Sequence, residues 1–213
     1  MNDIGVIFDC DGTLVDSMGA WHEVDRTLAA EAGITLTEAD AEAITYLHEQ
    51  CGLGESNEAV LEMIFDRMRA FYANEVEARP GALAFVQALH ERGVPMAVAS
   101  STPADMLATC VERCGFAPYM KTVVSVDDLQ TSKREPAVYD HARSFLGTDR
   151  AHTWAFEDAA YALDTLCAAG YRTGAIYDND ISGTRDQLFE RADFLIASWE
   201  DLDPDIFLAK AGA

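Results

Sequence analysis

Two aspartates one residue apart are the first side chains in the chain that could do chemistry. Asp9 and Asp11 directly follow the apolar run of residues 6–8 and precede a Gly12-Thr13 turn. Burying a carboxylate is costly unless a partner offsets its charge. The pair therefore requires a cation, a shared proton, or both. Phosphoryl transfer is chemistry of this kind, because it needs a nucleophile, neutralised charge and a proton for the leaving group.

Polar side chains also follow two later apolar runs. Ser100 and Ser101 come after residues 94–99, and Glu157 and Asp158 come after residues 152–156. Carboxylates at strand ends suit Mg²⁺, which prefers oxygen ligands and keeps several waters. A serine after a strand is by itself usually only a turn residue. The carboxylates therefore predict a metal site more strongly than the serines predict a phosphate site.

In their order along the chain, these segments resemble the four motifs of the haloacid dehalogenase superfamily. Residues 9–17 match the first motif, DxDGTLxDS, and Ser100 matches the second, a strand that ends in Ser or Thr. Residues 133–139 resemble the third, KPxPxxY, with Arg134 in place of the first proline. Residues 157–162 resemble the fourth, EDSxxG, with Ala159 and Ala162 in place of the serine and the glycine.

The resemblance implies a role for each of these positions. Asp9 would attack phosphorus to form an aspartyl-phosphate, and Asp11 would act as general acid and base. Lys133 would neutralise both nucleophile and phosphate. The predicted phosphate ligands are Ser100, Ser101 and Lys133. The predicted Mg²⁺ site consists of Asp9, Asp11, Glu157 and Asp158.

The elements that must position these residues alternate between strands and helices. The apolar pattern predicts strands at residues 4–8, 94–99, 122–126, 152–156, 173–177 and 194–197. Helices are expected at 82–92 and 104–114. This alternation indicates an α/β fold with a Rossmann-like, mostly parallel sheet covered on both faces. Such sheets bind ligands at the carboxyl ends of their strands.

One stretch after the first motif breaks the alternation. Val60, Ile64 and Met68 recur at helical spacing, and no convincing strand occurs between residues 17 and 78. We therefore expect a core of residues 1–16 and 79–213, interrupted by a helical cap domain of residues 17–78. The resemblance places such a cap in the phosphoglycolate phosphatase and β-phosphoglucomutase branch. Substrate choice would rest on cap side chains that the sequence does not assign, with Trp21, His22, Asp25, Tyr46, Arg67 and Arg69 as candidates.

The predicted function is a Mg²⁺-dependent phosphatase that acts on a small phosphorylated metabolite. A β-phosphoglucomutase-like mutase is one alternative, but the position of its cap histidine is held here by Trp21. His22 follows one residue later, which turns a helical side chain by about 100°. A phosphometabolite-binding protein without catalysis is a second alternative, motivated by the altered third and fourth motifs. The resemblance implies that dehalogenases and ion pumps of the superfamily lack an aspartate at the position of Asp11, and that phosphonate-cleaving members use a lysine of the cap. The presence of Asp11 therefore disfavours the first two activities. The absence of lysine between Asp16 and Pro80 disfavours phosphonate cleavage.

Composition narrows the partners further. The chain has 213 residues, with 15 basic against 37 acidic residues and a formal net charge of −22. This charge argues against nucleic acids and against anionic membrane surfaces as partners. No apolar run approaches the roughly 20 residues of a membrane span. Five cysteines, an odd number, fit reduced thiols in a cytoplasmic protein. A monomer is the default expectation, and a dimer stays open.

Overall fold

A parallel sheet of six strands forms the core of the fold. The computed structural model of the chain describes residues 4–34, 43–49, 51–179 and 182–212. The strand order is β3-β2-β1-β4-β5-β6, and every neighbouring pair is parallel. The predicted Rossmann-like α/β fold is confirmed. The strands are β1 (Gly5–Phe8), β2 (Met96–Ser100), β3 (Met120–Ser125), β4 (Thr153–Glu157), β5 (Arg172–Ile176) and β6 (Phe194–Ile196).

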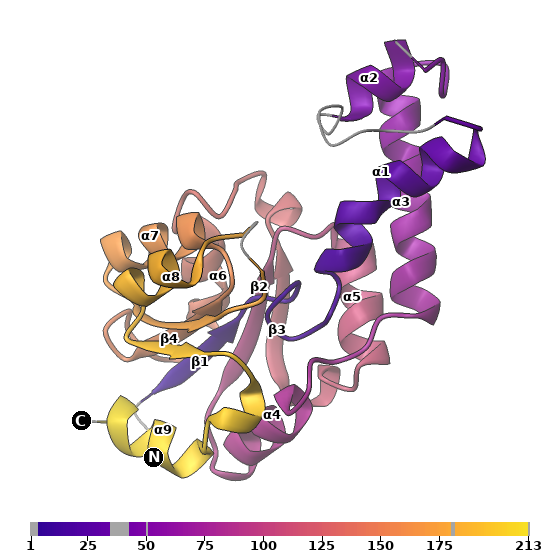
Figure 1. Cartoon of the computed structure of the whole chain (residues 1–213). Coiled ribbons are helices and arrows are strands. Elements are labelled where there is room, and N and C mark those ends of the chain that lie inside the picture. Colours follow the sequence, from indigo (N-terminus) through magenta and orange to yellow (C-terminus); the bar gives the residue numbers. More distant parts are fainter. Residues whose placement is uncertain (1–3, 35–42, 50, 180–181, 213) are drawn as a thin grey trace. The chain divides into compact units, whose positions relative to one another are not determined.

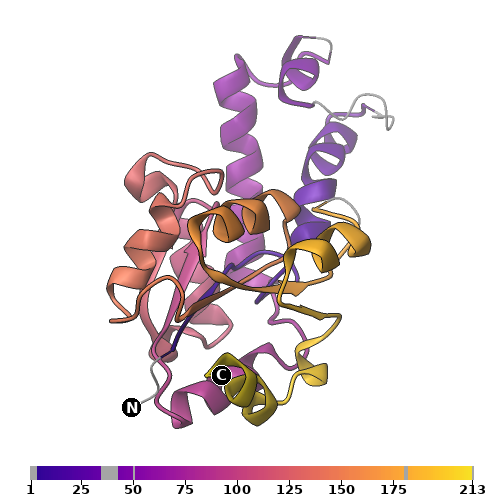
Figure 2. The same ribbon diagram turned by 90° about the vertical axis from the view of Figure 1, so that its left-hand side faces the viewer.

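The central strands carry continuous apolar runs because both of their faces are covered. All residues of β1, β2 and β4 are buried. The connecting helices of this unit lie on the two sides of the sheet, as Figures 1 and 2 show. These helices are α4 (Ala82–Glu91), α5 (Ala104–Arg113), α6 (Ala137–Ser144), α7 (Ala160–Ala169), α8 (Arg185–Arg191) and α9 (Pro204–Ala211).

Each face of the sheet has its own packing. On the side of α6 and α7, small and branched side chains such as Ile7, Val138 and Leu166 form one cluster. On the side of α4 and α9, aromatic rings pack edge to face, among them Phe85, Phe156 and Phe207. Such aromatic pairs contribute about 0.5–1.5 kcal/mol each beyond their buried area. The strands that carry the polar edge are therefore held rigidly from both sides.

The strand ends differ from the sequence prediction by one or two residues. β2 begins at Met96 instead of residue 94, because the N–H of Val94 bonds to Leu89 O at 3.1 Å and completes the end of α4. β3 begins at Met120 instead of residue 122, because Met120 pairs with Met96 across the sheet. Pairing with a neighbouring strand extends a strand beyond its apolar run, which local patterning does not reveal.

Residues Ser17–Glu75 form a second compact unit, separate from the unit of Met1–Asp16 and Val76–Ala213. Its helices are α1 (Met18–Glu31), α2 (Ala43–Glu49) and α3 (Asn57–Asn74). The Oγ of Ser56 caps α3 by accepting from the N–H of Ala59 at 3.2 Å. Val60, Ile64, Met68 and Tyr72 form the buried face of α3, at the spacing that predicted a helix. We call Ser17–Glu75 the cap unit and the remainder the core unit.

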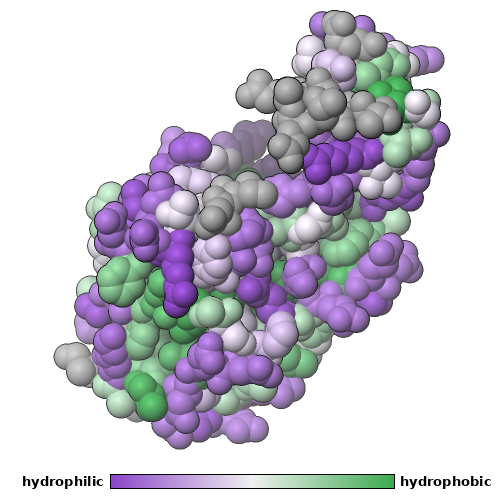
Figure 3. All heavy atoms as spheres, in the orientation of Figure 1, coloured by the Kyte–Doolittle hydropathy of each residue, from purple (hydrophilic) through white to green (hydrophobic). Residues whose placement is uncertain are grey.

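Hydrophilic residues cover most of the visible surface of both units (Figure 3). This distribution agrees with the formal charge of −22, most of which has to lie at the surface. Among the described residues, no helix has the length and apolar character needed to cross a membrane.

Candidate active site

Two adjacent strands bring three carboxylates together at the edge where they end. β1 and β4 are paired, with Phe8 opposite Phe156, so that Asp9 follows one strand while Glu157 and Asp158 complete the other. One oxygen from each of the three carboxylates lies within 4.8 Å of the others. The three residues are at most 5% exposed. This is the point where the strand order reverses, which is the expected ligand position in a doubly wound sheet.

Lys133 supplies a positive charge inside this group. Its Nζ donates hydrogen bonds to Asp9 Oδ1 and, at 2.7 Å, to Glu157 Oε1. The Tyr139 hydroxyl donates to the same Glu157 oxygen at 2.6 Å. Burial disfavours the ammonium, but the charges of Asp9 and Glu157 outweigh it, and the pKa of Lys133 is raised overall. Lys133 is therefore held as a fixed cation.

One cation does not neutralise three buried carboxylates. Burial raises the pKa of Asp9, even though Lys133 opposes the rise. Burial likewise raises the pKa of Glu157 to about 8 and that of Asp158 to about 7. With all three carboxylates ionised, the four groups carry −3 + 1 = −2. A divalent cation would balance this charge.

The donor set also fits a metal ion. Within the described part of the chain, Glu157 Oε2 and Asp158 Oδ2 are buried and have no hydrogen-bond partner. Unpaired buried oxygens of this kind are unusual and require an explanation such as a bound ion. Carboxylate oxygens are the ligands that hard divalent cations prefer. The carboxylates of Asp9, Glu157 and Asp158 could therefore hold such an ion.

Asp11 lies in a different environment from the other three predicted metal ligands. Thr102 donates its hydroxyl proton to Asp11 Oδ2, and Ser100 Oγ donates to the same oxygen at 3.4 Å. Among the described residues, the carboxylate cluster around Asp9 does not include Asp11. The Asp11 side chain thus points to hydroxyl groups beyond the end of β2, an orientation that suits proton transfer.

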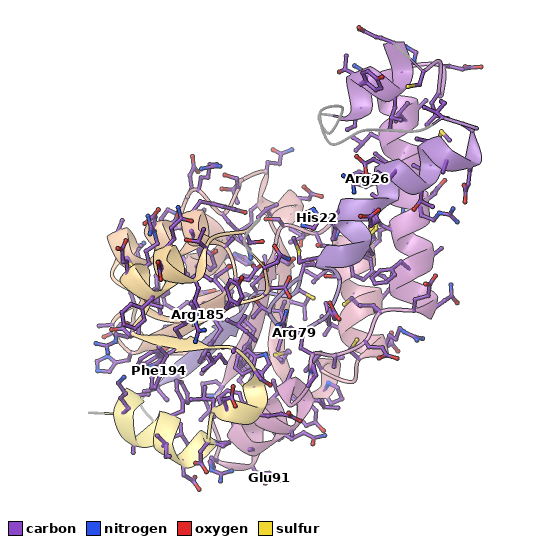
Figure 4. The ribbon with its side chains drawn as sticks, viewed as in Figure 1. His22, Arg26, Arg79, Glu91, Arg185 and Phe194 are labelled. Carbon is purple, nitrogen blue, oxygen red and sulfur yellow. The ribbon has the colours of Figure 1, made fainter. Side chains whose placement is uncertain are left out.

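Two side chains from distant parts of the sequence hold the turn that carries Asp11. Gly12 has φ 73°, a conformation that side-chain-bearing residues rarely adopt. Trp199 Nε1 donates to Thr13 O at 2.9 Å. Arg79, which is labelled in Figure 4, donates from Nη1 to Gly12 O at 3.0 Å and is paired with Asp178. The backbone around Asp11 is therefore fixed by residues from distant parts of the sequence.

The two predicted phosphate-binding serines lie in unlike places. Ser100 is the last residue of β2 and is buried, and its Oγ accepts from the N–H of Thr102 at 3.1 Å. Ser101 is exposed, and its side chain lies near the Tyr161 hydroxyl, whose pKa it acts to lower. Both serines belong to the turn that also carries Thr102.

Sequence reasoning missed three side chains of this site. Thr102, Tyr139 and Arg79 contact Asp11, Glu157 and Gly12 respectively. Tyr139 was visible as the last letter of the third motif. Thr102 lies two residues after Ser100, so the second motif already pointed to the segment that contains it. No local signal pointed to Arg79, whose partner Gly12 is 67 residues away.

Several cap candidates are bound within the cap unit. Trp21 Nε1 donates to the Tyr72 hydroxyl at 2.9 Å, which ties α1 to α3. His22 is partly buried on α1, and Arg26 follows it by one helical turn (Figure 4). The His22 Nε2 atom is buried and has no hydrogen-bond partner among the described residues. Arg67 is paired with Glu31.

The contacts described for the remaining cap candidates are local. Arg69 forms ion pairs of 2.7 Å with Glu62 and Asp66. Asp25 accepts from the backbone N–H of Arg26 at 2.8 Å. Tyr46 is partly buried on α2. These contacts do not single out a specificity residue.

Comparison with known proteins places the chain in a family. Residues 5–170 match the model of the haloacid dehalogenase-like hydrolases, so the chain belongs to this family. It is 29% identical over 178 residues to phosphoglycolate phosphatase from Rhodobacter capsulatus, covering 78% of this chain and 80% of the relative. It is 28% identical over 178 residues to hexitol phosphatase A from Escherichia coli (strain K12), covering 81% and 82%.

The fold is also that of solved members. The crystal structure of CbbY from Rhodobacter sphaeroides in complex with phosphate superposes with a TM-score of 0.75 at 21% identity, over 95% of this chain and 96% of that chain. The predicted class, a phosphoric monoester hydrolase of this family, is confirmed by the family match and by relatives named as phosphatases. Phosphorylated small molecules are the substrates of this class.

Proposed function

We propose that the protein is a Mg²⁺-dependent phosphatase that hydrolyses a small phosphorylated metabolite through an aspartyl-phosphate at Asp9. The observation that carries the proposal is the buried group of Asp9, Lys133, Glu157 and Asp158 at the ends of β1 and β4. The burial of three carboxylates beside a single ammonium is unfavourable unless a divalent cation balances the remaining negative charge. Asp9, Glu157 and Asp158 would hold that cation.

In the first half-reaction, an Asp9 carboxylate oxygen attacks phosphorus while the bond from phosphorus to the leaving oxygen breaks. Asp11 gives its proton to the leaving oxygen, and Ser100 and Thr102 hold the Asp11 carboxylate in place. Lys133 stabilises negative charge on the nucleophile and on the phosphoryl oxygens. Mg²⁺, when bound, would screen the repulsion between carboxylate and phosphate.

In the second half-reaction, Asp11 takes a proton from water as the water oxygen attacks phosphorus. The bond between phosphorus and the Asp9 oxygen breaks, which releases inorganic phosphate and restores the Asp9 carboxylate. The same group thus serves as acid and then as base. The sum is the hydrolysis of one phosphate ester bond.

Turnover of p-nitrophenyl phosphate tests the proposal directly. We expect hydrolysis with Mg²⁺, loss of activity with EDTA, and recovery when Mg²⁺ is added back. Absence of turnover with Mg²⁺ across the pH range would contradict the proposed function and favour a phosphometabolite-binding protein. Mn²⁺ and Ca²⁺ in parallel reactions would test the choice of metal.

The substrate class rests on the relatives and on the site together. The compared enzymes are named for phosphoglycolate and for hexitol phosphates, which are small phosphate monoesters. We propose a substrate of similar size. A screen of sugar phosphates, phosphoglycolate and nucleoside monophosphates would identify it.

Hydrolysis is favoured over mutase chemistry by the contacts of α1. Trp21, at the position where the resemblance implies the mutase histidine, is hydrogen-bonded to Tyr72 inside the cap unit. Neighbouring His22 points about 100° away from it on the same helix. Turnover in ¹⁸O-labelled water separates the two reactions. Label in the released phosphate supports hydrolysis, and return of the phosphoryl group to a sugar supports a mutase.

A further inference from the structure

Three side chains that have no part in the mechanism above meet beside the candidate active site. The guanidinium carbon of Arg134 lies 4.7 Å from the centre of the Tyr161 ring. The Ser101 side chain lies near the Tyr161 hydroxyl, where it opposes the rise of the Tyr161 pKa. All three residues are exposed. We call Ser101, Arg134 and Tyr161 the rim cluster.

The rim cluster borders the catalytic groups, with Ser101 and Arg134 on loops and Tyr161 in the first turn of α7. Ser101 follows Ser100, Arg134 follows Lys133, and Tyr161 comes three residues after Asp158. Its three members therefore come from the chain segments at the ends of β2, β3 and β4. Burial raises the pKa of Tyr161, and the charges of Lys133, Glu157 and Asp9 also act on it. The phenol is thus close enough to the reacting centre to sense its charges.

Arg134 is a cation whose charge no neighbouring carboxylate neutralises in the described part of the chain. Arg150 and Arg191 each form ion pairs with carboxylates. Arg134 forms none with the residues that the structure describes, although 37 acidic residues are present in the chain. It also stands where the third motif of the family has proline. A cation without a carboxylate partner, next to a site that binds phosphate, is available for a negatively charged ligand.

The geometry of the pair suits binding of an anionic group. A guanidinium stacked on an aromatic ring keeps its N–H edges free, and these edges match the two oxygens of a carboxylate or phosphate. The ring also reduces the number of conformations that Arg134 can adopt, which lowers the entropy cost of binding. The Ser101 and Tyr161 hydroxyls provide additional hydrogen-bonding groups.

We propose that the rim cluster binds a second anionic group carried by the leaving group of the substrate. This inference rests on the proposed function for the identity of the reacting phosphate. It narrows the substrate class to phosphate monoesters that carry a carboxylate or another phosphate. Arg134 makes the charged contact, and Tyr161 positions it.

Matched substrate pairs test this proposal. One pair is 3-phosphoglycerate and glycerol 3-phosphate, which differ by a carboxylate against a hydroxymethyl group. The other is fructose 1,6-bisphosphate and fructose 6-phosphate, which differ by a second phosphate. We expect kcat/KM to favour the doubly anionic member of at least one pair by about tenfold or more, which corresponds to about 1.4 kcal/mol, because hydrogen bonds between charged groups are stronger than those between neutral groups. A preference in the first pair would identify the second anionic group as a carboxylate, and a preference in the second pair would identify it as a phosphate.

Variants assign the preference to the rim cluster. We expect Arg134→Gln to reduce the preference about tenfold, mainly through KM, and Arg134→Lys to retain part of it. Tyr161→Ala should reduce it more than Tyr161→Phe, which keeps the ring. Lys121→Gln removes an exposed charge at the opposite end of the strands, near the start of β3, and should leave the preference unchanged. An equal preference in wild type and Arg134→Gln, or no preference in either pair, would overturn the proposal.

A binding measurement separates this proposal from the proposed function. Calorimetry with the Asp9→Asn protein reports the affinity for each member of a pair without turnover. If wild type hydrolyses no ester but the binding preference persists and depends on Arg134, the proposed function fails and the rim cluster stands. If esters are hydrolysed but binding shows no dependence on Arg134, the rim cluster fails and the proposed function stands.

Discussion

The core unit and the cap unit hold their charged side chains in opposite ways. Lys133 is 3% exposed and is bonded to Asp9 and Glu157, which lie 124 and 24 residues away in sequence. In the cap unit, Arg69 is 37% exposed and is paired with Glu62 and Asp66 on its own helix. Charges of the first kind depend on the whole fold, whereas charges of the second kind depend on one helix. Substitution of a buried charge of the core unit should therefore reduce activity or stability far more than substitution of an exposed charge of the cap unit.

The largest difference in kcat is expected between substitution of the buried Asp9 in the core unit and substitution of an aspartate in the cap unit. Asp9→Asn should lower kcat by at least about 10³-fold, because the amide is a far weaker nucleophile than the carboxylate. Asp66→Asn in α3 is the matched control and should change kcat less than threefold, because Asp66 is exposed. Steady-state assays with p-nitrophenyl phosphate measure both, and circular dichroism shows that the variants are folded. Equal losses in the two variants would break the comparison.

Lysine and arginine provide the second contrast. Lys133→Met leaves buried carboxylates without their cation, and breaking a buried ion pair in this way costs about 3–5 kcal/mol. Arg69→Met removes exposed pairs and should cost less than about 1 kcal/mol. Urea unfolding at pH 7 gives both free energies of unfolding. A Lys133→Met protein as stable as wild type would show that the buried group does not depend on its ammonium.

A smaller effect is expected at Tyr139. Tyr139→Phe removes the 2.6 Å bond to Glu157 Oε1 and should weaken Mg²⁺ binding about 10- to 100-fold, since partners of ligating groups orient them. Titration of activity with Mg²⁺ measures this affinity. Tyr119→Phe is the control, because its hydroxyl bonds to Gln87 instead. Unchanged Mg²⁺ dependence in Tyr139→Phe would argue against Glu157 as a ligand.

The smallest effect concerns a partly exposed pair in the core unit. Hydrogen bonding to Arg150, with help from Tyr171, lowers the pKa of Asp140 below its usual value. The stabilisation is therefore present above the unfolded-state pKa of about 3.9 and is lost as pH falls through the lower, folded-state pKa. Asp140→Asn should lower the free energy of unfolding at pH 7 by less than about 1 kcal/mol, which urea unfolding would measure. A difference from wild type that did not shrink below about pH 4 would contradict this origin.

The fold and much of the candidate site could be predicted because their signals are local. Apolar runs indicated the strands, and each run that ends in a polar residue marks the carboxyl edge of the sheet. Asp9, Glu157 and Asp158 could be expected to meet because parallel strands end on the same side. The helical spacing of Val60, Ile64 and Met68 likewise revealed α3.

What could not be predicted depends on contacts between distant segments. Arg79 and Gly12 are 67 residues apart, and nothing in either local sequence signals the other. Thr102 could be placed near the site through Ser100, but its bond to Asp11, 91 residues away in sequence, could not be predicted. The separation of Asp11 from the other carboxylates is a matter of side-chain direction within one turn. Motif spacing places a residue at the site but does not say which oxygen it faces.

The central claim is that Asp9 becomes phosphorylated during turnover. Acid quenching of a single turnover, followed by mass spectrometry of the peptide that contains Asp9, measures this directly. We predict a mass increase of one phosphoryl group on Asp9 that disappears at alkaline pH and is absent from the Asp9→Asn protein. Phosphate release at the wild-type rate with no label on Asp9 at any quench time, or label on another residue, would contradict it.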